Sequence, residues 1–150
     1  MTSTTAAGST LAISAAAPAT ADAAGHAALT HTEVGGVEKI GGIGAIFAKV
    51  EFQPLKGPKD KHKGSADYGS LQPSMAYDEA DAGQVLMRTA ADDETSKLYS
   101  FKVTYPTGAI RYFQGRVFGF PENTDGADTV IMANPTIEIC RKVVRVAAPI

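Results

Sequence analysis

The fold is decided by the stretch Leu98-Tyr99-Ser100-Phe101-Lys102-Val103-Thr104-Tyr105-Pro106-Thr107-Gly108 and, two residues further on, Arg111-Tyr112-Phe113-Gln114-Gly115-Arg116-Val117. In its first half, large apolar side chains alternate with polar ones, which is the period of a strand with one buried face. Pro106, Thr107 and Gly108 supply turn chemistry, and a second alternating run follows. The sequence therefore predicts an antiparallel hairpin whose core residues are Tyr99, Phe101, Val103, Tyr105, Tyr112, Phe113 and Val117.

Weaker strand patterns flank this hairpin on both sides. They predict four further strand regions, at residues 9–16, 46–52, 71–77 and 129–146. In the second of these, Lys49 and Glu51 alternate with apolar residues, which is typical of a half-buried strand. Pro135 lies inside the last region and requires an edge strand, a bulge or two shorter strands. We expect Gly115 to mark a bulge or a close backbone approach.

One helix is expected between the strand regions, from Asp78 to about Ala91. Asp78 and Asp81 place carboxylates in its first turn, where the helix dipole favours negative charge. A narrow apolar stripe from Ala82 to Ala90 gives this helix one buried side. The Ala-rich residues 18–26 are expected to form a linker.

Two segments are predicted to lack regular structure. Residues 1–8 are small and polar, which indicates a mobile N-terminal arm preceding a single domain over residues 9–150. Residues 55–70 contain almost nothing to bury, so we expect a long structureless loop there. Because such loops are uncommon in a small domain, this one is expected to be functional or ordered by a partner.

The predicted loop and the predicted helix carry opposite charge. Within residues 56–63, four lysines face one aspartate, and residues 78–94 hold six acidic residues against Arg88. The loop is compatible with a solvated segment, a phosphate-binding segment or a segment that docks on an acidic partner. If the two segments meet on different subunits, the contact is heterologous and generates rings or filaments. The candidate contact residues are Lys56, Lys59, Asp60, Lys61, His62, Lys63 and Tyr68 in the loop, with Asp78, Glu79, Asp81, Asp92, Asp93 and Glu94 as a possible acidic counter-surface.

Composition excludes several functional classes. The 150 residues correspond to one domain, and a net charge of −2 does not favour a protein that binds nucleic acid by neutralising phosphates. Cys140 is the single cysteine, so no disulfide framework or cysteine zinc cluster is expected. The histidines, His26, His31 and His62, have no metal-binding spacing. With no nucleophile beside a base, we expect neither a cofactor nor an enzymatic activity.

No membrane or export segment is expected either. The sequence contains no apolar run near the length that crosses a bilayer. Its Ala-rich start imitates a signal peptide, but no Lys or Arg precedes Lys39 and the apolar stretch is weak.

The hairpin residues, from Leu98 to Tyr105 and from Arg111 to Val117, resemble the C-terminal half of the major tail tube protein of lambda-type long-tailed phages. That family has an aromatic strand, a turn of the Pro-x-Gly type and an aromatic-x-Gly-x-Val strand. A helix before the hairpin and a final strand of the Thr136-Ile137-Glu138-Ile139 type complete the pattern. The resemblance covers about residues 46–146. The chain departs from the family in its loop, which is basic here and acidic in the lambda-type proteins.

This resemblance implies a mainly β fold, with a β-sandwich or half-barrel of two antiparallel sheets flanked by one helix, shared with the type VI secretion tube protein. It implies a structural subunit that forms stacked hexameric rings through which viral DNA passes without specific binding. Tape-measure, tail-terminator and baseplate proteins are the implied partners. The protein would be made in the bacterial host cytoplasm and reside in the virion tail. The loop 55–70 and the arm 1–8 would become ordered on ring stacking.

Two other functions compete with a tube subunit. A monomeric β-sandwich that binds a ligand or acts as an adhesin would have an exposed binding patch and no self-assembly. A small hydrolase would require a nucleophile and a base, which the sequence does not place near each other.

Overall fold

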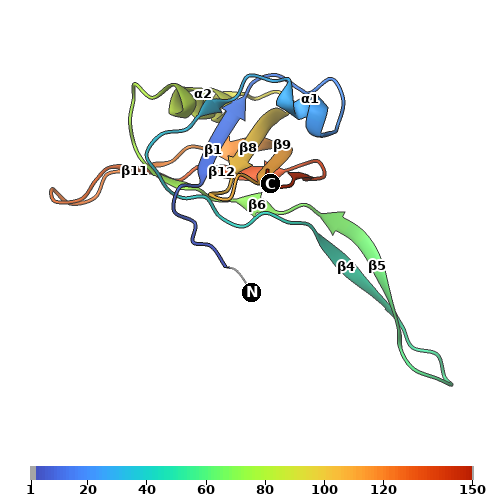
Figure 1. Cartoon of the computed structure of the whole chain (residues 1–150). Helices are drawn as coiled ribbons and strands as arrows, with labels where there is room; N and C mark the ends of the chain where they lie inside the picture. Colours follow the sequence, from blue (N-terminus) through green and yellow to red (C-terminus); the bar gives the residue numbers. More distant parts are fainter. Residues whose placement is uncertain (1–2, 150) are drawn as a thin grey trace.

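The computed structural model describes residues 3–149 and is centred on a seven-stranded antiparallel sheet (Figure 1). The path through this main sheet is β2 (Thr32–Glu33), β1 (Thr10–Ser14), β8 (Tyr99–Thr104), β9 (Ile110–Gly119), β12 (Thr136–Ile139) and β6 (Ser70–Leu71). The ten-residue β9 also pairs with β13 (Val144–Val146) near its start, because β12 occupies only its second half.

The β8–β9 hairpin lies at the middle of the main sheet, as the alternating sequence predicts. Phe101 is paired with Phe113, and the two rings stack at 5.3 Å between centroids. At the turn, the Tyr105 N–H donates to the Ala109 carbonyl, and Gly108 adopts a φ of +94°, which favours glycine. Gly115 marks a close backbone approach, since an added Cβ would collide with the Glu138 carbonyl of β12.

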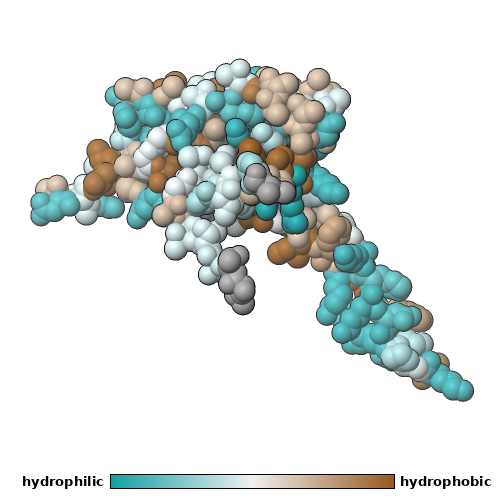
Figure 2. Space-filling view, in the orientation of Figure 1, coloured by the Kyte–Doolittle hydropathy of each residue, from teal (hydrophilic) through white to brown (hydrophobic). Residues whose placement is uncertain are grey.

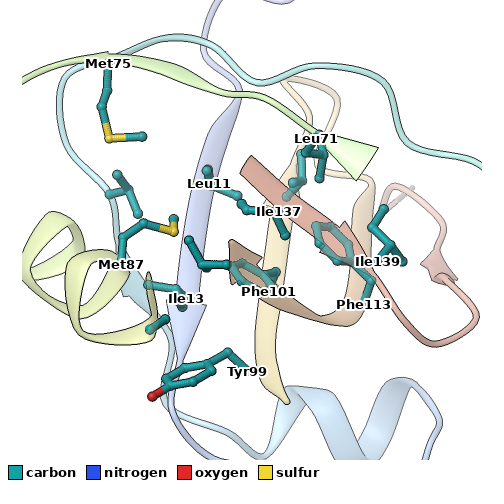
Figure 3. Close-up of a cluster of buried hydrophobic side chains, with 14 of the residues drawn as sticks. Leu11, Ile13, Leu71, Met75, Met87, Tyr99, Phe101, Phe113, Ile137 and Ile139 are labelled. Atoms are coloured by element: carbon teal, nitrogen blue, oxygen red, sulfur yellow. The ribbon is translucent and has the colours of Figure 1, made fainter. Parts of the chain in front are cut away.

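One face of the main sheet packs against a second sheet and a helix. The four-stranded second sheet has the order β10 (Glu122–Asn123), β11 (Met132–Ala133), β7 (Ser74–Ala76) and β3 (Val37–Lys39), and the helix is α2 (Ala82–Asp92). Apolar side chains from all these layers meet in one core, which Figure 3 shows around Phe101 and Phe113. Its fully buried members include Leu11, Ile13, Leu71, Met75, Met87, Val103 and Ile137. The fold is therefore mainly β, as expected.

The opposite face of the main sheet is covered as well, which the sequence analysis did not anticipate. The predicted linker 18–26 runs into a short helix, α1 (Ala23–Ala27), and Asp22 caps it by accepting from the Gly25 N–H at 2.8 Å. His26 of α1 is buried and stacks on Tyr112. The prediction of a single helix was wrong, because Asp22 supplies an N-cap within an otherwise featureless Ala-rich run.

One hairpin residue lies away from the core to which it was assigned. Tyr112 is buried, but on the α1 side of the sheet, whereas Tyr105 is half-buried beyond the end of β8 and packs against the edge of the core. The reason is the strand period: Tyr112 neighbours Phe113, so their side chains emerge on opposite faces.

Other boundaries differ from the predicted ones for identifiable reasons. Helix α2 begins after Asp81 rather than at Asp78, because the Asp81 carboxylate caps it by accepting from the Gln84 N–H at 3.0 Å. Buried Pro73 lies between the two short strands β6 and β7 of region 71–77. Pro135 likewise separates β11 from β12, which is the alternative of two shorter strands.

The predicted loop 55–70 is largely a strand. Residues of β5 (Asp60–Asp67) pair antiparallel with β4 (Ile46–Phe52) to form a separate two-stranded sheet that projects from the body (Figure 1). We call this β4–β5 hairpin the arm. The prediction of a half-buried β4 was also wrong, because all seven of its residues are exposed. The polar strand β5 pairs with β4 through backbone hydrogen bonds. The exposed lysine side chains of β5 take no part in these bonds and leave them intact.

Candidate assembly surfaces

The arm exposes apolar side chains that a small domain would normally bury. Ile46, Val50 and Phe52 are 76%, 51% and 60% exposed, and Leu55 in the tip is fully exposed. In Figure 2 the projecting arm is mostly hydrophilic, with hydrophobic surface at its root and near its tip. An exposed group of large apolar side chains marks a contact site for another molecule.

The basic residues expected to make contacts lie on the same arm. Lys56, Lys59, Asp60, Lys61, His62 and Lys63 are all exposed. Two ion pairs form within the arm: Glu51 is 2.8 Å from Lys49 and 3.4 Å from Lys59. Tyr68 is the exception among the predicted contact residues, because it lies at the root of the arm and packs against the core.

The six acidic residues of 78–94 do not form one surface. They lie at the two ends of the eleven-residue α2, which separates them by about 16 Å at 1.5 Å per residue. Several have structural partners: Asp78 accepts from the Ala80 N–H, and Asp93 accepts from the Tyr99 hydroxyl at 2.9 Å. Hydrogen bonds from Thr95, followed by that from Tyr99, lower the pKa of Asp93. Glu79, Asp92 and Glu94 are exposed.

Asp81 takes part in a buried polar connection that the sequence analysis missed. Its carboxylate accepts from the N–H groups of Gly35 and Gln84, both at 3.0 Å. The fully buried Gln84 amide donates to the carbonyls of Gly35 and Ala76 and accepts from the Asp78 N–H. The connection ties α2 to the second sheet, so Asp81 serves folding. The sequence gives no signal that Gln84 is buried, because its hydrogen-bond partners are backbone groups outside the helix.

A basic cavity at the root of the arm was also missed. It has a volume of about 710 Å³ and lies between residues 43–45, which lead into β4, and the paired ends of β9 and β13. Its charged lining is entirely cationic: Arg111, Lys142 and Arg145. We call this the basic cavity. Lys142 and Arg145 follow Arg111 by 31 and 34 positions in the sequence. The three cations become neighbours only because β13 pairs with β9.

A second projection carries the opposite charge. Residues 122–128 comprise β10 and the first part of the loop that leads from β10 to β11. They contain Glu122, Asp125 and Asp128 and no Lys or Arg. All seven residues are exposed, and Val130 and Ile131 just beyond them are 65% and 43% exposed. We call residues 122–128 the acidic loop. In Figure 1 it projects from the side of the body opposite the arm.

The part of the chain from residue 3 to residue 149 presents neither a metal site nor a membrane-spanning helix. No group of three or more His, Cys, Asp or Glu side chains in that range is placed to hold a metal ion. None of the described helices is long and apolar enough to cross a membrane. The Cys140 thiol is half-buried and lies 3.4 Å from Arg116.

These features define a class of protein: a small antiparallel β-sandwich that presents a long two-stranded arm and an oppositely charged loop on different sides. No protein-family model matches the sequence, and no curated protein is significantly similar to it.

Solved structures nevertheless share the fold across almost the whole chain. A chain in the six-fold symmetrised baseplate of the anti-feeding prophage (AFP) aligns with a TM-score of 0.74 at 6% identity, covering 100% of this chain and 99% of that one. A chain in the sheath/tube terminator of the extracellular contractile injection system PVC gives a TM-score of 0.68 at 8% identity, covering 98% and 99%. A chain in the PVC sheath-tube complex gives 0.63 at 9% identity, covering 91% and 88%. The mainly β fold is thus that of components of such particles.

Proposed function

We propose that this chain is a structural, non-enzymatic subunit of the tube of a phage tail or a phage-tail-like particle. The observation that carries the proposal is the exposed apolar arm on a body whose fold matches chains of contractile injection particles from end to end. An isolated monomer gains nothing from exposing Ile46, Val50 and Phe52, whereas a subunit buries such residues on assembly.

The edges of the main sheet support self-assembly. Its outermost strands, β2 and β6, are two residues long, and β2 pairs with only Ala12 and Ile13 of β1. The outer sides of these two short strands face no further strand of the main sheet, so their backbone edges are available to another chain. Pairing such edges between copies into a closed barrel removes them, so we propose rings of six copies around a central channel. The AFP structure is described as six-fold symmetrised, which agrees with this number.

The wider setting is proposed from the same fold. The structural neighbours come from contractile particles, so a sheathed tube is the expected setting rather than the bare flexible tail that the lambda-type resemblance implies. Tape-measure, terminator and baseplate proteins would contact the ends of the tube. In a virion, DNA would pass through the channel without specific binding, because a chain with a net charge of −2 does not retain phosphates.

The arm is proposed to dock on neighbouring copies when rings stack. Its apolar residues supply area to bury, and its lysines favour an acidic receiving surface. Residues 1–8 are proposed to act with it; residues 1 and 2 lie outside the described part of the chain, and Ser9 N–H donates to the Ala6 carbonyl in a turn.

The test is assembly of the purified chain, followed by negative-stain microscopy and sedimentation velocity. Wild type is expected to form rings and tubes in a concentration-dependent way. Replacing Lys56, Lys59, Lys61 and Lys63 with Ser should shorten or abolish tubes without unfolding the body, since exposed substitutions change stability by less than about 0.5 kcal/mol. Val50→Ser with Phe52→Ser should act likewise.

A body variant with Lys39→Ser and Lys97→Ser is the control, because both lysines are exposed outside the arm. It should assemble as wild type does. A wild-type chain that stays monomeric at every concentration, also with a terminator or baseplate partner added, would instead favour the monomeric binding module.

A further inference from the structure

The basic cavity brings like charges together without neutralising them. Arg111 of β9 and Arg145 of β13 are directly opposite each other in the strand register, and Lys142 lines the same cavity. Like charges at directly opposed positions of paired strands repel. The Arg111 guanidinium lies over the Tyr105 ring at 5.0 Å, which holds it in place without cancelling its charge.

No carboxylate of residues 3–149 lies within 4.0 Å of the charged nitrogens of these three cations. The ion pairs in that range, at 4.0 Å or less, are the two that Glu51 makes within the arm. Because the cavity is lined by three cations and no acid, a bound anionic group would convert a repulsive cluster into an attractive one.

The acidic loop has the chemistry that this cavity fits. In the chain, its three carboxylates are followed by the exposed apolar residues Val130 and Ile131, whereas the cavity sets its three cations beside Ile43 and Val143. Charged and apolar groups are thus matched on both sides. The phosphate backbone of a nucleic acid would match the cations alone, so a protein loop is the better occupant.

We propose that the basic cavity of one copy of this chain binds the acidic loop of a second copy. This inference rests on the proposed self-assembly and names the contact that drives it. Cavity and loop are different surfaces on opposite sides of the body (Figure 1), so the contact is heterologous and each copy can both donate and receive a loop. Such a contact repeats from copy to copy and closes into a ring when the rotation permits.

Charge reversal tests the contact. The cavity variant carries Lys142→Glu and Arg145→Glu, and the loop variant carries Asp125→Lys and Asp128→Lys; all four residues are exposed. Each variant alone should need at least about tenfold more protein to assemble in sedimentation velocity, since a tenfold change corresponds to about 1.4 kcal/mol. One chain carrying all four substitutions should regain wild-type assembly, because the complementary charges are exchanged rather than removed.

The matched control is Lys39→Glu with Lys97→Glu, which makes the same change of charge as the cavity variant at two exposed lysines of the body. It should leave assembly unchanged. Circular dichroism of each variant checks folding, and Lys142→Gln with Arg145→Gln replaces the cavity variant if that variant does not fold.

The outcomes separate this inference from the proposed function. Failure of wild type to assemble would overturn both. Normal assembly of the cavity and loop variants, failure of the fourfold variant to recover, or loss of assembly in the lysine control alone would overturn the contact and leave the tube subunit standing. Loss of short duplex DNA binding in the cavity variant, with assembly unchanged, would make the cavity a nucleic-acid site instead.

Discussion

At the scale of single residues, Gln84 holds α2 to the second sheet through three hydrogen bonds with backbone groups. Its side chain is fully buried and makes three hydrogen bonds of 2.8–2.9 Å. Leaving a buried polar group unpaired costs about 1–3 kcal/mol each. A single amide therefore controls the docking of a whole helix.

Gln84→Leu should lower the free energy of unfolding by about 3 kcal/mol, because it strands the Gly35 and Ala76 carbonyls and the Asp78 N–H. Urea unfolding measures this. Val85→Gln at the neighbouring, 42% exposed position is the control and should change stability by less than about 0.5 kcal/mol. Equal effects at the two positions would contradict the role assigned to Gln84.

Two histidines, the buried His26 and the half-buried His31, lie close to Tyr112 on the α1 side of the main sheet. The rings of His26 and His31 lie 5.2 and 5.8 Å from Tyr112, and His26 Nδ1 and His31 Nε2 are buried without hydrogen-bond partners. Burial lowers the pKa of His26, against the opposing effect of Asp22. Burial, then the charge of Lys102, lowers the pKa of His31. Burial in the folded protein thus disfavours the charged form of both side chains.

The free energy of unfolding should therefore fall as the pH drops below about 6.5, the ordinary pKa of histidine. In that range the histidines of the unfolded chain bind more protons than those of the folded chain, whose pKa values are lower. Urea midpoints at about pH 7.5 and 5.5 measure the decline. His26→Gln with His31→Gln should flatten it, whereas His62→Gln on the exposed arm should preserve it. An unchanged slope in the double variant would assign the decline to other groups.

At the scale of elements, the contact between α2 and β2 depends on a missing side chain. A Cβ added at Gly83 would collide with the Glu33 carbonyl and lie 2.6 Å from the Val34 Cα. The helix can approach the sheet this closely only because position 83 has no side chain. Gly83 is buried within a helix, where the sequence pattern treats it as a weakness.

Gly83→Ala should destabilise the protein by about 1–3 kcal/mol, since overpacking forces α2 away from β2. Helix propensity alone predicts the opposite sign, a gain of up to about 1 kcal/mol. Thermal and urea unfolding decide between the two. Thr89→Ala, on the exposed side of α2, should stay within about 0.5 kcal/mol of wild type.

At the scale of the whole molecule, the body and its projections differ in what stabilises them. The body has a common core, whereas the arm is a two-stranded sheet whose side chains are largely exposed. Two-stranded hairpins are marginally stable in water. The arm should therefore open readily in the free subunit and become protected in an assembly.

Limited trypsin digestion measures this difference. The free subunit should be cut first at the arm lysines, Lys49 to Lys63, with the body left intact. In assembled wild type, the arm should be cut at least about tenfold more slowly if it docks on neighbours. Cleavage at the same rate in both states would contradict the docking.

The elements that could be predicted from the sequence are those set by alternation of apolar and polar residues along a strand and by turn-forming residues. Strict alternation and a Pro-Thr-Gly turn specify the β8–β9 hairpin, because side chains of a strand must emerge on alternate faces. Pro135 required an edge strand, a bulge or two shorter strands, and the structure has two shorter strands, β11 and β12. The charge of the arm was visible as a run of lysines.

The pairing of strands that are distant in the sequence could not be predicted and is seen only in the folded protein. A strand without apolar alternation, such as β5, forms when β4 offers it backbone partners, and Arg111 and Arg145 become neighbours only when β13 joins β9. The acidic residues of segment 78–94 do not form one surface, because α2 separates them into two groups, one at each of its ends. In addition, Asp81 and Asp93 accept hydrogen bonds from Gly35 and Tyr99 within the folded body. Backbone hydrogen bonding and burial depend on which segments meet in space, and a local pattern does not contain that information.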